Sequence, residues 1–345
     1  MVKLAEVTTL AVGGEAKEFF TATDPHSAID LIKSADQSGE PILILGGGSN
    51  LLVADSGFEG RVIKIESTGI SFEEDQCSGG FITVAAGEDW DQFVDWSIKN
   101  NFSGLETLSG IPGTVGASPI QNIGAYGREI SESIARIRVY DRKLNEMKTF
   151  TQAQCEFSYR SSLFKRNLDR YFIVEVIFQL KKGEQSLPIL YQELADHLNI
   201  AIGDRRDLKS VRQAVLEIRK RKGMVLDPLD PDTRSAGSFF INPIIELSEL
   251  PKGAPSWPVD GDSSSKIKTS AAWLIENAGI KKGFSLGGAA ISSKHVLAIT
   301  NRSGSAEGGE GATAEEIYKL AQVCIKAVEE KFAIRLESEV RLLGF

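Results

Sequence analysis

Two glycine-rich segments constrain the fold of this chain more than any other feature. The first, "GGGSN" at 46–50, directly follows the apolar run "PILIL" at 41–45. That continuous run predicts a strand buried on both faces, and the glycines after it let backbone N–H groups approach an anion closely. The second, "SGIPGTVGASPIQNIGAYG" at 109–127, has five glycines, two prolines and almost no charge. Solvated loops are usually polar, so this loop is predicted to lie against a large, partly apolar ligand.

The two loops follow successive α/β patterns, which favours a flat cofactor with a pyrophosphate between them. Neither loop has the GxGxxG spacing ahead of a helix, and neither matches GxxxxGK[ST]. Both absences disfavour a Rossmann dinucleotide site and an ATP-hydrolysing P-loop. Taken alone, 46–50 also fits an ordinary turn between two strands.

Composition limits the remaining classes. The 345 residues predict two or three domains, and the net charge of −8 does not indicate a nucleic-acid surface. The basic run "IRKRKG" at 218–223 fits either a solvated helix end or an anion site. The cysteines lack CxxC spacing and the histidines lack ligand pairing, which argues against a metal and for a reducing cytoplasm; they are Cys77, Cys155, Cys324, His26, His197 and His295. We see no signal peptide or membrane span and expect a cytoplasmic protein.

Periodicity predicts alternating strands and helices. Strands are expected within 40–65, 81–106, 134–141, 170–180 and 289–301, and helices at 27–39 (ending at Gly39), after the strand of 81–106, and at 206–222 and 270–280. Segment 227–237 is a turn-rich candidate boundary, and 303–313 a flexible loop. Thr313 and Glu316 form a capping-box pattern before a helix. One face of that helix is apolar: Ile317, Leu320, Ala321, Cys324 and Val328. The last segment, 332–345, is expected to be a strand.

Five motifs in order resemble one known family. They are "ILGGGSNLLVAD", "LSGIPGTVGASPIQNIGAYG", "CEFSYRSSLFK", "SAGSFFINP" and "LESEVRLLG", and the resemblance runs from Val12 to Gly344. The chain is similar to the UDP-N-acetylenolpyruvoylglucosamine reductase (MurB) family. The resemblance implies an α/β and α+β flavin fold of the PCMH/vanillyl-alcohol-oxidase type. Its expected parts are an FAD subdomain at 1–67 joined by strand 336–345, a second at 68–226, and a substrate domain at 227–335.

The resemblance also implies the reaction. FAD, reduced by NADPH, would serve to reduce the enolpyruvyl ether of a UDP-sugar to a lactyl ether, giving UDP-N-acetylmuramate for peptidoglycan. The protein would be a monomer with no nucleic-acid partner. FAD contacts are expected at Gly46, Gly47, Gly48, Ser49, Asn50, Gly113, Thr114, Gly116, Ala117, Gln121, Asn122, Gly124 and Ala125.

Three residues match the family's catalytic positions. Ser238 would be the acid that protonates the α-carbon, with Gly237 allowing a tight turn and the two following phenylalanines enclosing the site. Arg160 would hold the substrate carboxylate in a two-pronged grip. Glu339 would donate a hydrogen bond to the developing enolate. From the residues alone, Ser238 also fits a turn serine beside core phenylalanines, and Arg160 a surface ion pair. Spacing does not separate Glu339 from Glu337, which would share a strand face.

Substrate contacts carried over from the family are Tyr159, Tyr191, Lys222, Asn242 and His295. Tyr191 resembles a tyrosine on a loop that closes over the diphosphate, and the role of His295 stays open.

The sequence leaves two alternative functions open. An FAD oxidase of the same fold would often attach flavin through histidine or cysteine near the glycine loop, and 107–130 has neither. The other rival is a non-catalytic UDP-sugar binding protein.

Overall fold

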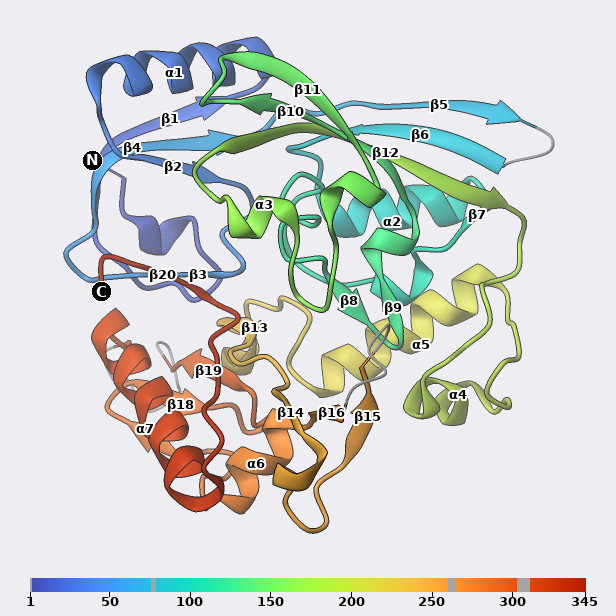
Figure 1. Ribbon diagram of the computed structural model, residues 1–345, viewed down its shortest axis with the longest axis vertical. Helices are drawn as coiled ribbons and strands as arrows, with labels where there is room; N and C mark the ends of the chain where they lie inside the picture. The colour runs from blue at the N-terminus through green and yellow to red at the C-terminus, as the bar shows by residue number, and fades with distance from the viewer. Residues whose placement is uncertain (1, 76–78, 260–264, 303–310) are drawn as a thin grey trace. The chain divides into compact units, whose positions relative to one another are not determined.

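The computed structural model describes residues 2–75, 79–259, 265–302 and 311–345. Cys77 and most of the predicted loop at 303–313 lie outside the described residues. The chain forms two compact units, each built from separate stretches of sequence (Figure 1). The first unit contains 16–48 and 59–225, and the second contains 2–15, 49–58 and 226–345.

A three-stranded sheet opens the first unit. Its order is β1 (Ala16–Ala22), β4 (Phe58–Ile65) and β2 (Ile42–Leu45), with β2 and β4 parallel. Helix α1 (Pro25–Ser38) packs on it, starts at the capping carboxylate of Asp24, and ends at the left-handed Gly39, as predicted. In β2, Leu43 and Leu45 are buried, but Ile42 and Ile44 are only half-buried. The expectation of full burial on both faces is therefore wrong, because the face with Ile42 and Ile44 packs against the cluster around α1 without being fully covered.

A larger antiparallel sheet forms the rest of the first unit's framework. Its order is β11 (Glu146–Thr151), β10 (Ile134–Asp141), β12 (Tyr171–Lys182), β6 (Gly79–Ala85) and β5 (Ile70–Asp75). Helix α2 (Trp90–Lys99) contributes Trp90 and Phe93 to a fully buried aromatic core, where the Phe93 and Phe178 ring centroids lie 4.9 Å apart. The strands predicted at 134–141 and 170–180 are confirmed.

Shorter elements complete the first unit. They are β7 (Phe102–Ser103), β8 (Gly124–Ala125), β9 (Arg128–Glu129), α3 (Leu163–Arg166), α4 (Gln192–Leu198) and α5 (Leu208–Arg221). Asp207 caps α5, and α4 packs on α5 through a small apolar cluster that includes Leu194 and Val215. This packing fixes the backbone of α4 against the helix that carries the basic run.

The second unit has a four-stranded antiparallel sheet covered by two helices. Its order is β13 (Ser235–Ser238), β19 (Ala298–Asn301), β18 (Ala289–Ile291) and β17 (Ser285–Leu286). Helices α6 (Ala271–Asn277) and α7 (Ala314–Phe332) share its core, and the Thr313–Glu316 capping box and predicted apolar face of α7 are confirmed. A smaller sheet contains β14 (Ile244–Glu246), β16 (Lys266–Thr269) and β15 (Ser256–Pro258).

The end of the chain differs from the expected long strand. Only β20 (Arg341–Leu343) is regular, and it pairs in parallel with β3 (Leu51–Val53).

Short 3₁₀ helices lie at Leu4–Glu6, Glu106–Leu108, Ile130–Glu132, Ala153–Cys155, Pro231–Thr233 and Leu247–Glu249. Among the described residues, no helix is long and apolar enough to cross a membrane, and no metal-binding cluster occurs.

Candidate active site

The two glycine loops pack closely within the first unit. A Cβ added to Gly46 would lie 2.5 Å from Thr114 Oγ1, and one added to Gly47 would lie 2.7 Å from the Gly113 Cα. Real Cβ atoms do not approach backbone as closely as 2.7 Å, so only glycine at position 47 lets the two loops meet in this way. The predicted cofactor residues on 46–48 and 113–114 are therefore brought together, and the glycine cradle fits a group that the backbone must approach closely.

The second glycine loop is held in place by its backbone and by one buried amide. Gly116 N donates to Ala86 O at 2.8 Å, which docks the loop on the turn between β6 and α2. The fully buried Asn122 donates from Nδ2 to Glu129 Oε2 at 2.6 Å and to Ser158 O at 3.0 Å. Asn122 thus organises the loop and connects it to the turn that carries Arg160.

Arg160 reaches this loop directly. It lies in a tight turn closed by Ser158 and Ser161, with a left-handed φ of 52° that is uncommon outside glycine. Its guanidinium donates to Gly124 O at 2.7 Å and Asn122 O at 3.3 Å and lies over the ring of Tyr159. The structure therefore brings Arg160 and Tyr159 together with two predicted cofactor residues, and gives Arg160 bonds beyond those of a surface ion pair.

Ser238 ends β13 in the second unit, where it pairs with Ala298. Gly237 before it has a φ of 72°, which allows the tight turn expected there. Phe239 and Phe240 are almost fully buried, and their rings belong to the core of the second unit, 5.3 Å apart. These rings anchor the backbone that presents the half-buried Ser238.

Glu339 lies beside the Ser238 segment. Its N–H donates to Phe239 O at 2.9 Å, and its carbonyl accepts from Asn50 Nδ2 at 3.1 Å. Two predicted catalytic segments and one predicted cofactor residue therefore meet within the second unit. Glu337 is exposed whereas Glu339 is half-buried. The segment is not a regular strand, so strand periodicity does not apply to the two residues, and the difference in burial separates them.

Lys222 is bonded to Glu193, a residue two places after Tyr191 that the sequence analysis missed. Tyr191 precedes α4, and its ring meets Tyr126 edge-on at 5.6 Å. Lys222 follows α5, and its Nζ donates to Glu193 Oε2 at 2.5 Å. Burial raises the pKa of Tyr126 to about 12 and also raises the pKa of Tyr191. Tyr126 and Glu193 lie in the motifs "GAYG" and "YQEL", but their contacts depend on tertiary structure.

Two more predicted substrate residues, Asn242 and His295, accept hydrogen bonds from backbone N–H groups of the second unit. Asn242 Oδ1 accepts from Ala271 N at 3.0 Å at the start of α6. His295 Nδ1 accepts from Leu297 N at 3.2 Å within the turn before β19. These bonds orient Asn242, between β13 and β14, and His295, between β18 and β19.

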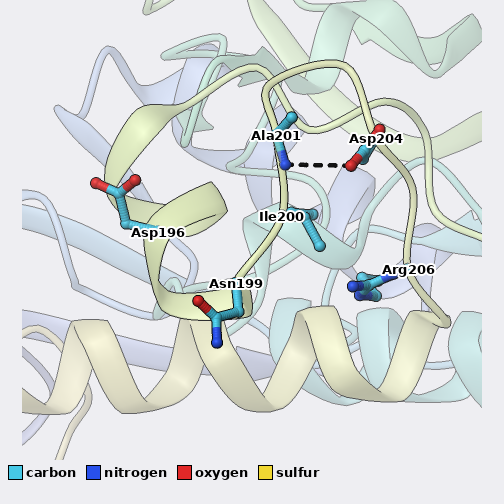
Figure 2. Close-up of a pocket in the computed structure, with 6 residues that line it drawn as sticks. All are labelled: Asp196, Asn199, Ile200, Ala201, Asp204 and Arg206. Atoms are coloured by element: carbon cyan, nitrogen blue, oxygen red, sulfur yellow. Dashed lines mark hydrogen bonds between the residues drawn. The ribbon is translucent and has the colours of Figure 1, made fainter.

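The basic run at 218–223 is only partly solvated. Arg219 is turned inward, donates to Met224 O at 2.8 Å, and has a pKa lowered by burial. A pocket of about 520 Å³ lies between the end of α4 and the segment that follows it, and Figure 2 shows its six lining residues. They are Asp196, Asn199, Ile200, Ala201, Asp204 and Arg206, and none is a predicted site residue. A second pocket of about 330 Å³ lies beside α1 and β10 and also lacks predicted site residues.

Comparison with known proteins covers both units. Residues 16–143 match the family "FAD binding domain", and residues 227–343 match "UDP-N-acetylenolpyruvoylglucosamine reductase, C-terminal domain". The structure resembles the reductase (MurB) from Thermus caldophilus, with a TM-score of 0.65 and 25% identity over 99% of this chain and 98% of that one. These matches establish an FAD-binding fold of the expected type.

Curated relatives are similar over almost all of this chain. The UDP-N-acetylenolpyruvoylglucosamine reductase of Cutibacterium acnes is 47% identical, over 99% of this chain and 89% of the relative. The reductase of Thermobifida fusca is 45% identical, over 99% of this chain and 97% of the relative. With its paired glycine loops and the Ser238–Glu339 arrangement, the chain belongs to the UDP-N-acetylenolpyruvoylglucosamine reductase family.

Proposed function

We propose that this protein reduces the enolpyruvyl ether of UDP-N-acetylglucosamine-enolpyruvate with NADPH, giving UDP-N-acetylmuramate for peptidoglycan synthesis. The observation that carries the proposal is the similarity, over 99% of this chain, to curated UDP-N-acetylenolpyruvoylglucosamine reductases. The close packing of Gly46 and Gly47 on the second glycine loop supports it, because that cradle suits a flavin pyrophosphate.

FAD is proposed to bind along both glycine loops. When bound, FAD supplies the hydride carrier between NADPH and the terminal vinyl carbon of the substrate. The residues proposed to hold it are Gly46, Gly47, Gly48, Ser49, Asn50, Gly113, Thr114, Gly116, Ala117, Gln121, Asn122, Gly124 and Ala125. The bond from Asn50 to the Glu339 carbonyl connects this set to the catalytic segment.

Arg160 and Glu339 are proposed to stabilise the charge that develops on the substrate. As the vinyl group is reduced, negative charge builds on the α-carbon and the carboxylate. A guanidinium binds both carboxylate oxygens at once, and its grip strengthens as charge builds. A protonated Glu339 would donate a further hydrogen bond to the same group. The bonds from Arg160 to the glycine-loop carbonyls fix the guanidinium beside the proposed cofactor residues.

Ser238 is proposed to donate the proton that completes the reaction at the α-carbon. A serine hydroxyl is a weak acid, so it needs a strongly basic acceptor such as the enolate and a site from which water is excluded. The buried rings of Phe239 and Phe240 hold its backbone rigidly, which suits a group that must meet one carbon atom.

The UDP-sugar is proposed to contact Tyr159, Tyr191, Lys222, Asn242 and His295. Tyr191 and Lys222 would face the diphosphate. We also propose a division into FAD subdomains at 1–67 with 336–345 and at 68–226, and a substrate domain at 227–335. The protein would act as a cytoplasmic monomer, without a nucleic-acid partner, which agrees with its net charge of −8.

One spectrum tests the proposal. The purified protein is expected to be yellow, to bleach on anaerobic addition of NADPH, and to recover its absorbance when the UDP-sugar is added. Rapid recovery in air without turnover of the UDP-sugar would indicate an oxidase instead. A protein that stays colourless after incubation with FAD would indicate a binding protein.

A further inference from the structure

The first turn of α4 connects two of the proposed substrate ligands. Tyr191 immediately precedes the helix, and Glu193 is its second residue. The Glu193 carboxylate accepts a hydrogen bond from Lys222 Nζ at 2.5 Å, and Lys222 directly follows α5. The two helices share an apolar cluster, so their backbones keep these side chains within reach.

Tyr191, two residues before Glu193, has a separate contact with Tyr126. Its ring meets Tyr126 at right angles, with an interplanar angle of 86° and centroids 5.6 Å apart. An edge-to-face pair of this kind contributes to the position of both rings. Tyr191 is therefore positioned by Tyr126, and Lys222 by Glu193. Tyr191 and Glu193 both lie at the start of α4.

We infer that Glu193 is a positioning residue, which holds the Lys222 ammonium beside Tyr191 so that both face the substrate diphosphate. The inference rests on the proposed function, which assigns the diphosphate to Tyr191 and Lys222. A lysine ammonium has three N–H donors. When one N–H group of Lys222 is bonded to Glu193, its other N–H groups remain for phosphate oxygens.

Lysine needs such a partner because its four-carbon stem is flexible. Ordering a long side chain on binding opposes affinity, so a residue that orders it beforehand strengthens binding. The pair is partly exposed, with 32% of the lysine and 38% of the glutamate side chain accessible. Exposed ion pairs are weak, and the expected effect on substrate affinity is therefore modest, about 2–5-fold.

The test compares two variants of the holoenzyme with the same loss of charge. Glu193→Gln is expected to raise the KM for the UDP-sugar, and the Kd for UDP, about 2–5-fold. The kcat, flavin content and bleaching by NADPH stay unchanged. Asp196→Asn is the control, because Asp196 lies on the same helix but pairs with Gln192 and borders the pocket of Figure 2. Its KM is expected to stay at the wild-type value.

A double variant separates positioning from other roles. In a Lys222→Met background, Glu193→Gln is expected to have no further effect on KM, because the lysine it holds is gone. An equal effect in both backgrounds would overturn the inference, as would a lower KM in Glu193→Gln, which would mean that Glu193 competes with the diphosphate. Wild-type enzyme that does not turn over the UDP-sugar contradicts the proposed function. Normal wild-type turnover with an unchanged KM in Glu193→Gln contradicts this inference alone.

Discussion

Ser238, the proposed proton donor, is followed directly by two buried phenylalanines. The substitution Ser238→Ala removes only the hydroxyl, and the neighbouring core phenylalanines keep the strand in place. We expect bleaching of the flavin by NADPH at the normal rate, and reoxidation by the UDP-sugar slowed by about 10²–10⁴-fold, the usual effect of losing a general acid. Stopped-flow absorbance measures both steps. Equal slowing of the two steps would remove Ser238 from the acid role.

The role proposed for Arg160 requires the planar shape of its guanidinium as well as its charge. Arg160→Lys keeps the charge but cannot bind two oxygens in one plane, so we expect kcat/KM to fall about 10–100-fold. Arg138→Lys is the matched control, since Arg138 lies on β10, pairs with Glu175 and is not a proposed site residue. Steady-state kinetics of both variants decide the matter, and near-normal turnover of Arg160→Lys would contradict the role.

Asp141 stabilises the first unit through charge. Its carboxylate is fully buried and bonded to Arg170 and Lys148, and these bonds lower its pKa from 3.8 to about 2. A depressed folded-state pKa gives stability that is present above pH 3.8 and is lost as the pH falls through about 2.

Asp141→Asn is therefore expected to lower the free energy of unfolding by about 1–2 kcal/mol at pH 7, since both partners are partly exposed. The difference from wild type should shrink between pH 4 and pH 2. Thermal unfolding across that range measures it. A constant difference at all pH values would show that the effect does not come from ionisation.

The glycine loops act as paired elements, not as single residues. Gly47→Ala would place a methyl group 2.7 Å from the Gly113 Cα, and backbone cannot move aside cheaply. We expect the loops to separate and the flavin content of the purified protein to fall severalfold. Gly39→Ala is the control: Gly39 lies at the end of α1 with a left-handed φ of 68°, and a Cβ added there meets nothing within 4 Å. It should cost about 1 kcal/mol of stability and keep its flavin, as the absorbance ratio of flavin to protein will show.

At the scale of the whole molecule, each unit depends on distant parts of the chain. The core of the second unit includes Leu10, Val12 and Leu52 as well as residues beyond 226. Burying each such side chain contributes about 1.5–3 kcal/mol, so losing all three removes an amount comparable with a typical total stability of 5–15 kcal/mol. An isolated fragment 226–345 is therefore expected to lack a cooperative thermal transition. A sharp transition by near-ultraviolet circular dichroism would contradict this view.

The sequence by itself determined the local structure and the chemical class. Helix α1 ends at Gly39, α7 starts at its capping box, and β10 spans 134–141, because caps and periodicity depend on near neighbours. The order of the motifs identified the family. The site residues carried over by resemblance stay predictions, which the kinetic experiments above test.

Only the tertiary structure decided burial and long-range pairing. It made β2 an edge strand, placed Phe239 and Phe240 in a core, and joined Asn50 to Glu339 across 289 positions of sequence. It also paired Glu193 with Lys222, which no local pattern indicates. These features depend on which segments the fold brings together. That outcome is set by the packing of the whole chain, and no single window of the sequence contains it.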